Sequence, residues 1–125
     1  MDNLKNNSED RQESDGAIEQ TGYFLGNMMV SGTWSYNSLE TTTRDISINV
    51  TITDVYNAKI SRITYAYKTS FEEDFHEEEY DKLDPTSCNY KFTGLAPYND
   101  YTVKATVYFE DIDENISQES LIRVH

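Results

Sequence analysis

Residues 45–53, DISINVTIT, decide the fold class of this chain. Ile46, Ile48, Val50 and Ile52 alternate with small polar residues, a period of two that is typical of a strand with one buried face and one face in water. The same period predicts further strands at residues 28–34, 62–68, 89–93, 101–109 and 116–124. No stretch has an apolar stripe at helical spacing, and β-branched and aromatic residues dominate the periodic runs. We therefore expect an all-β protein.

The number and spacing of these segments predict the architecture. About seven short strands within about 100 residues fit a single antiparallel β-sandwich. We assign residues 28–125 to this domain and residues 21–27 to a lead-in or docking arm. No repeat with a solenoid period is visible in the sequence.

The charge of the chain excludes some classes of partner. Its 125 residues include 23 acidic and 10 basic side chains, for a formal net charge of −13. Nucleic-acid binding is not expected, because phosphate neutralisation needs a basic stripe. Anionic membrane surfaces are disfavoured for the same reason. The sequence has no apolar run long enough to cross a bilayer and no signal peptide at its start, so we expect no membrane insertion.

Two segments carry −11 of this charge. Residues 1–20 contain six acids and two bases and few large apolar side chains, a composition that predicts a disordered tail. Residues 72–84, EEDFHEEEYDKLD, contain eight acids and one base but also Phe75, Tyr80 and Leu83. The second segment is therefore expected to be a loop or an edge of the sandwich.

Residues 92–107, FTGLAPYNDYTVKATV, resemble the corner between strands E and F of a fibronectin type III domain. In that family a Gly-Leu-x-Pro turn precedes a strand that opens with Tyr. Here Gly94, Leu95 and Pro97 form the turn, and Tyr101 opens the strand. The resemblance implies a tyrosine corner, in which the Tyr101 ring is buried, its hydroxyl bonds backbone a few residues upstream and Leu95 closes the bottom of the core.

Residues 60–67, ISRITYAY, look like the C strand of the same family. The family usually has Trp in strand B, where this chain has Ile52, and the only Trp is Trp34 in the first predicted strand. The arrangement of strands therefore stays open between the fibronectin type III-like and another immunoglobulin-like form. The resemblance covers about residues 28–125 and implies a module, which can be a spacer, an adhesin, a receptor, an accessory domain of a glycan enzyme or a virion decoration.

The acidic residues allow a metal hypothesis, because Ca²⁺ is bound by clustered carboxylates. The alternatives for residues 72–84 are a solvated edge that prevents strand pairing, or a docking surface for a basic partner. Asp111 and Asp113 resemble the opening of an EF-hand loop, but Ile116 and Ile122 stand where that loop needs Gly and Glu, so we expect an acidic hairpin turn. The candidate metal ligands are Glu72, Glu73, Asp74, Glu77, Asp111 and Asp113. No metal site and no cofactor are expected.

Catalysis has little support in the sequence. The two histidines, His76 and His125, have no nucleophile motif beside them. The single cysteine, Cys88, excludes an internal disulfide and is expected to be a small core residue rather than a nucleophile. We therefore expect no catalytic residues and no enzyme activity.

Residues 21–37, TGYFLGNMMVSGTWSYN, concentrate large apolar side chains directly after the acidic tail. One interpretation is a first strand with a lead-in that packs on its own sandwich. The other is an arm whose apolar part docks on a neighbouring subunit. The candidate partner-binding residues are Tyr23, Phe24, Leu25, Met28, Met29 and Trp34.

These observations predict a non-enzymatic binding or assembly module. The first hypothesis is a structural decoration or adhesion protein on a larger particle such as a phage virion, with a protein partner or self-assembly and a location on a virion or cell surface. The alternative is a fibronectin type III-like spacer or carbohydrate-binding accessory domain of a secreted or surface bacterial protein. Glycan binding would need exposed aromatic side chains, for which Tyr56, Tyr98 and Tyr108 are candidates.

Overall fold

The structure is a computed structural model that describes residues 22–80 and 87–125. The described residues form seven strands and no helix. The strands are β1 (Asn27–Tyr36), β2 (Arg44–Thr53), β3 (Ile60–Thr69), β4 (His76–Tyr80), β5 (Ser87–Leu95), β6 (Asp100–Phe109) and β7 (Ile112–Arg123). The predicted tail at residues 1–20 lies outside the described part.

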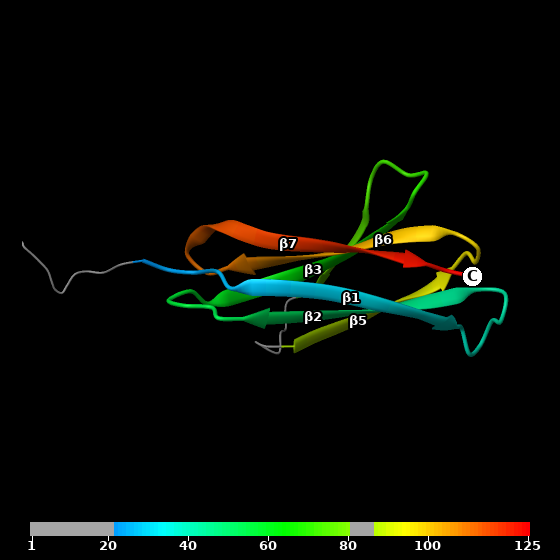
Figure 1. Cartoon of the computed structure of the whole chain (residues 1–125), viewed down its shortest axis with the longest axis horizontal. Helices are drawn as coiled ribbons and strands as arrows, with labels where there is room; N and C mark the ends of the chain where they lie inside the picture. Colours follow the sequence, from blue (N-terminus) through cyan, green and yellow to red (C-terminus); the bar gives the residue numbers. More distant parts are fainter. Residues whose placement is uncertain (1–21, 81–86) are drawn as a thin grey trace, which may run out of the picture.

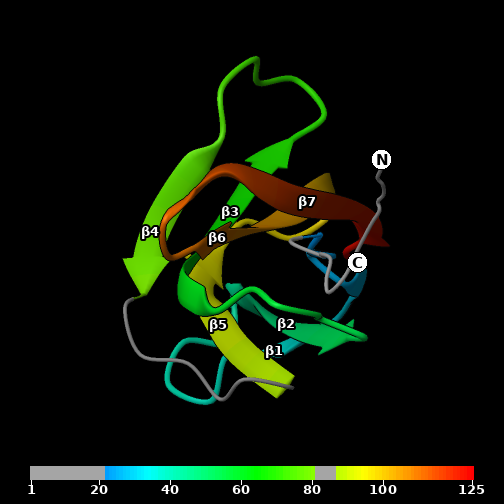
Figure 2. The same ribbon diagram turned by 90° about the vertical axis from the view of Figure 1, so that its left-hand side faces the viewer.

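The strands form two antiparallel sheets that pack face to face (Figures 1 and 2). One sheet has the order β1-β2-β5, and the other has the order β4-β3-β6-β7. The prediction of an all-β antiparallel sandwich is therefore confirmed. The odd-numbered strands run toward the end of the sandwich that carries the C-terminus, and the N-terminal lead-in lies at the opposite end (Figure 1). We call these the C-terminal end and the N-terminal end.

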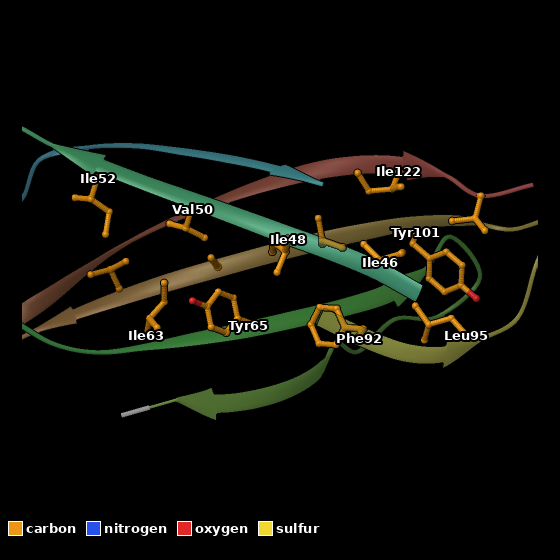
Figure 3. Packing of buried hydrophobic residues seen from close by; sticks show 14 of the residues in the cluster. Ile46, Ile48, Val50, Ile52, Ile63, Tyr65, Phe92, Leu95, Tyr101 and Ile122 are labelled. Carbon is orange, nitrogen blue, oxygen red and sulfur yellow. The ribbon is translucent and has the colours of Figure 1, made fainter. Parts of the chain in front are cut away.

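The core forms where the inward faces of the two sheets meet (Figure 3). The alternating residues Ile46, Ile48, Val50 and Ile52 of β2 are each at most 2% exposed. They face buried side chains of the other sheet, among them Ile63, Tyr65, Val103, Ala105 and Val107. Full burial of one such aliphatic side chain contributes about 1.5–3 kcal/mol, so the period-two pattern of β2 is a main source of stability.

The corner between β5 and β6 has the geometry expected of a tyrosine corner. Tyr101 is 2% exposed, and its hydroxyl donates a hydrogen bond to the Ala96 carbonyl at 2.7 Å. Leu95 is buried next to Tyr101 at the C-terminal end of the core, and Pro97 is half-buried in the turn (Figure 3). Gly94, with φ of +72°, lies in an irregularity of the β2–β5 register and donates its amide to the Asp45 carboxylate at 3.4 Å.

The start of β7 differs from the sequence prediction. The sequence pattern predicts a turn at residues 111–115 and a strand from residue 116, but Ile112 already pairs with Phe109, so only Glu110 and Asp111 form the turn. Asp111 has φ of +59°, a conformation that Asp tolerates better than most residues. The register then shifts before Asn115 pairs with Tyr108, so residues 113–114 form a bulge rather than part of the turn.

The acidic run includes an edge strand. β4 pairs only with β3, from Ile63↔Tyr80 to Tyr67↔His76, and a five-residue edge strand rich in charge resists further pairing. The rest of the predicted acidic segment includes residues 81–86, which lie outside the described part. The side chain of Cys88 is also outside it; the backbone of Cys88 pairs with Val50 in the β2–β5 ladder.

Candidate functional site

The predicted docking arm lies against its own sandwich. Phe24 and Tyr56 exchange two backbone hydrogen bonds, from the Phe24 amide to the Tyr56 carbonyl at 2.9 Å and from the Tyr56 amide to the Phe24 carbonyl at 2.8 Å. The Asn57 side-chain amide donates to the Gly22 carbonyl at 3.1 Å. The arm is thus fixed to the β2–β3 loop at the N-terminal end (Figure 1).

Gly26 makes this path of the arm possible. Its φ is +101°, and a Cβ at this position would lie 2.8 Å from both the Thr53 carbonyl oxygen and the Val55 Cγ2. A side chain there would meet backbone on one side and a branched side chain on the other, so only glycine fits. Leu25, the preceding residue, packs against the core.

The six predicted partner-binding residues are divided between the core and the surface. Leu25, Met28 and Trp34 pack against the core, as expected if the segment belongs to its own domain. Trp34 lies at the other end of β1, where its ring is 5.4 Å from the Tyr36 ring and 5.7 Å from the Arg44 guanidinium carbon. Met29 points outward and is 74% exposed.

The remaining two residues lie with Tyr56 at the N-terminal end of the sandwich. Tyr23 is 44% exposed, Phe24 48% and Tyr56 66%, and all three lie on the arm and the loop that it pairs with. We call Tyr23, Phe24 and Tyr56 the aromatic end. Hydrogen bonding to the Glu114 carboxylate, near the start of β7, raises the pKa of Tyr23. Sequence reasoning did not place Tyr56 beside the arm, because the backbone bridge joins residues 32 positions apart.

The tyrosines considered for glycan binding do not share a platform. Tyr56 lies in the β2–β3 loop at the N-terminal end, and Tyr98 lies in the β5–β6 loop at the C-terminal end. Tyr108 is half-buried on β6, where the Arg62 guanidinium carbon is 3.8 Å from the centre of its ring. Only Tyr56 and Tyr98 are strongly exposed.

The candidate metal ligands also lie apart. Glu72, Glu73 and Asp74 are in the loop between β3 and β4, and Glu77 is on β4. Asp111 and Asp113 are at the β6–β7 turn, at the opposite end of the sandwich. Among the described residues, no group of three or more His, Cys, Asp or Glu side chains could hold a metal ion.

The β3–β4 loop projects from the sandwich and is held by Glu72 (Figure 2). One carboxylate oxygen of Glu72 accepts hydrogen bonds from the Thr69 amide at 2.9 Å and the Thr69 hydroxyl at 3.2 Å. The other oxygen lies 2.6 Å from the His76 Nε2. The Thr69 amide, and then His76, lower the pKa of Glu72. Phe71 is exposed in this loop.

This network is not arranged for nucleophilic catalysis. The Glu72 carboxylate bridges Thr69 and His76, whereas a triad needs the imidazole between the nucleophile and the acid. His76 instead stacks on Tyr67, with ring centroids 4.8 Å apart. His125, the other histidine, contacts the Trp34 ring. The bonds from Glu72 to Thr69 and His76 therefore hold the conformation of the β3–β4 loop.

A row of aromatic rings closes the side of the sandwich where β4 and β5 are the edge strands. Tyr90 of β5 stacks on Tyr65 of β3 at 5.0 Å, and its hydroxyl donates to the Glu78 carboxylate of β4 at 2.9 Å. Burial, and next this hydrogen bond, raise the pKa of Tyr90. This hydrogen bond joins the two sheets, so the side of the sandwich at β4 and β5 has a structural role. The aromatic end is therefore the candidate interaction surface.

In comparisons with known proteins, no family model, no curated protein and no solved structure matches this chain. Within the described ranges there is no helix that is long and apolar enough to cross a membrane.

Proposed function

We propose that this chain is a non-enzymatic binding module with the fibronectin type III variant of the immunoglobulin-like fold. The position of β4 supports this variant. In a constant-type immunoglobulin domain the fourth strand joins the sheet of the first, second and fifth strands, whereas β4 here pairs with β3 in the opposite sheet. The hydrogen bond from Tyr101 to Ala96 in the β5–β6 corner is a second supporting feature.

The proposed role is attachment to a larger particle, such as a phage virion or a cell surface, as a decoration or adhesion protein. The observation that carries it is the aromatic end: three exposed aromatic side chains, each at least 44% exposed, stand on backbone that is fixed by paired hydrogen bonds. Aromatic residues are enriched at protein interfaces because each buries a large area and loses few rotamers.

The fixed backbone makes this surface suitable for binding. An arm that had to become ordered on contact would lose about 1–2 kcal/mol of backbone entropy per residue. The bonds from Phe24 to Tyr56 and from Asn57 to Gly22 have already ordered the arm in the free chain. The aromatic end can therefore bind as a preformed surface.

Co-sedimentation tests the proposal. The probe is the particle fraction, virions or envelope fragments, pelleted from the organism that encodes the chain. We expect the wild-type chain to pellet with these particles and Phe24→Ser combined with Tyr56→Ser to stay in the supernatant. The matched control is Leu39→Ser combined with Tyr98→Ser, which removes two exposed apolar side chains at the C-terminal end. This control should pellet like wild type.

A wild-type chain that is monomeric in sedimentation velocity and pellets with no particle fraction contradicts the proposal. So does a control variant that loses binding while the Phe24 and Tyr56 variant keeps it. Both variants replace exposed side chains, so their melting temperatures should stay close to wild type and loss of fold would not explain the result.

The second candidate is a spacer or accessory domain in a string of modules. One observation favours it: the lead-in and the C-terminal strand leave the sandwich at opposite ends (Figure 1). Such a module can be joined end to end with others. A flat response on a glycan array would remove the carbohydrate-binding form of this candidate, which the separation of Tyr56, Tyr98 and Tyr108 does not favour.

A further inference from the structure

β1 is a long edge strand whose outer backbone edge has no partner among the described residues. Its ten residues, Asn27–Tyr36, pair with β2 in one antiparallel register without a shift. β7 runs beside β1 in the opposite sheet, where the Ile122 side chain packs at Gly32, but no ladder joins these two strands (Figure 1). The outer N–H and C=O groups of β1 are therefore open to a further strand.

The other three edge strands carry features that resist pairing. β4 has five residues, three of which are glutamates. β7 contains three acids and is interrupted by its bulge. β5 has a register irregularity at Gly94, and its side of the sandwich is closed by the hydrogen bond from Tyr90 to Glu78. Charges and bulges are the usual protection of an edge strand, and β1 has neither.

The surroundings of the β1 edge are also uncharged, although the whole chain has a charge of −13. Residues 27–39 contain no charged residue, and neither do residues 46–53 of β2. When two identical strands pair about a two-fold axis, the side chains of one meet those of its copy, so an acidic strand would oppose acids to acids. At β1 a second acidic chain would meet no charge along the strand.

We propose that β1 pairs antiparallel with β1 of a second copy of this chain. The result is a two-fold dimer with a continuous six-stranded sheet in the order β5-β2-β1-β1-β2-β5. Ten paired residues span about 34 Å and exchange about ten backbone hydrogen bonds. A basic partner would be drawn to acidic edges such as β4, whereas an uncharged edge suits a partner with the same excess of acids.

Sedimentation velocity of the full wild-type chain over a range of concentrations tests this proposal. We expect a reversible equilibrium between monomer and dimer. The dimer should be favoured several-fold more in about 1 M salt than in about 0.01 M salt, because salt screens the repulsion between two chains of charge −13. A chain that is monomeric at every concentration and salt would overturn the proposal. So would a dimer that dissociates as salt is raised, because opposite charges would then hold it together.

Charged substitutions in the middle of β1 test whether this strand makes the contact. Ser31→Lys combined with Thr33→Lys should remain monomeric, and so should Ser31→Glu combined with Thr33→Glu. A mixture of the two variants should restore the dimer, because opposite charges then meet across the paired strands. The matched control is Asn49→Lys combined with Thr51→Lys, two exposed positions on β2 in the same sheet, which should dimerise like wild type.

All these variants replace exposed side chains, so their melting temperatures should stay close to wild type. A Lys variant of β1 that still forms the dimer would overturn the proposal, and so would a mixture of the Lys and Glu variants that stays monomeric. The Phe24→Ser and Tyr56→Ser variant separates this contact from attachment to a particle. It should lose binding to particles and keep the dimer; loss of the dimer would place the contact at the aromatic end instead of β1.

Amide exchange followed by NMR is a second, independent measurement. In an edge strand that is bonded on one side, every second amide has no partner and exchanges fast. Under conditions in which sedimentation shows a dimer, the fast amides of residues 28–35 should slow relative to dilute solution, and those of β7 should not change. Unchanged exchange at residues 28–35 in the dimer would overturn the proposal.

Discussion

Replacing Tyr101 by Phe removes one hydroxyl from the β5–β6 corner and keeps the ring. The hydroxyl donates to the Ala96 carbonyl at 2.7 Å, and the Tyr101 side chain is 2% exposed. Ala96 is itself exposed, so its carbonyl can bind water after the substitution. The loss should therefore lie near the usual net value of a hydrogen bond, about 0.5–1.5 kcal/mol. For a domain of this size, about 1 kcal/mol corresponds to a fall in Tm of roughly 4–8 °C.

Urea unfolding measures this effect. Tyr101→Phe should lower the midpoint and leave the slope unchanged, because the surface exposed on unfolding is the same. The matched control is Tyr98→Phe in the same turn, whose exposed hydroxyl should contribute almost nothing. Leu95→Ala provides the upper reference, with an expected loss of about 2–5 kcal/mol from the core. A Tyr101→Phe midpoint equal to that of the control would refute the reasoning about the corner.

Three other perturbations have defined outcomes. Gly26→Ala should destabilise the chain by more than about 1 kcal/mol in urea unfolding, because its Cβ would meet the Thr53 carbonyl; an unchanged midpoint would show that the arm is not held as described. The Thr69 amide and His76 lower the pKa of Glu72, so the Glu72 carboxylate stabilises the loop above the ordinary carboxyl pKa, and this stabilisation is lost as the pH falls through the lowered value. Amide NMR of the β3–β4 loop should show this acid transition in wild type. The same transition in Glu72→Gln would contradict the assignment to Glu72. Burial raises the pKa of Tyr67 and Tyr90, so the sandwich should be fully stable below about pH 10 and lose stability as the pH rises through the raised values, with both phenols ionising late in an ultraviolet titration.

The period-two pattern made the central strands predictable. In β2 every second residue is apolar because one face of the strand is buried, so local sequence and long-range packing agree. β4 was harder to predict because it is an edge strand with acidic side chains on both faces; its inward-facing Glu78 is accommodated by the Tyr90 hydroxyl. The start of β7 depended on a positive φ at Asp111, which no apolar pattern indicates.

The candidate site was predictable as a segment but not in its details. Composition alone indicated that residues 21–37 concentrate apolar side chains. Which of these side chains are buried depends on the path of the backbone, and that path follows from the φ of Gly26 and the bridge from Phe24 to Tyr56. Tyr56 joins the aromatic end only through tertiary pairing, so no local signal could have placed it there.

Hydrogen–deuterium exchange of the chain bound to the particle fraction tests the central claim most directly. If the aromatic end is the contact surface, amides of residues 22–26 and 54–57 exchange more slowly in the bound chain than in the free chain. The loops at the C-terminal end, which carry Leu39, Phe71 and Tyr98, exchange at the same rate in both states. Slower exchange confined to those loops, or none at residues 22–26, would contradict the account.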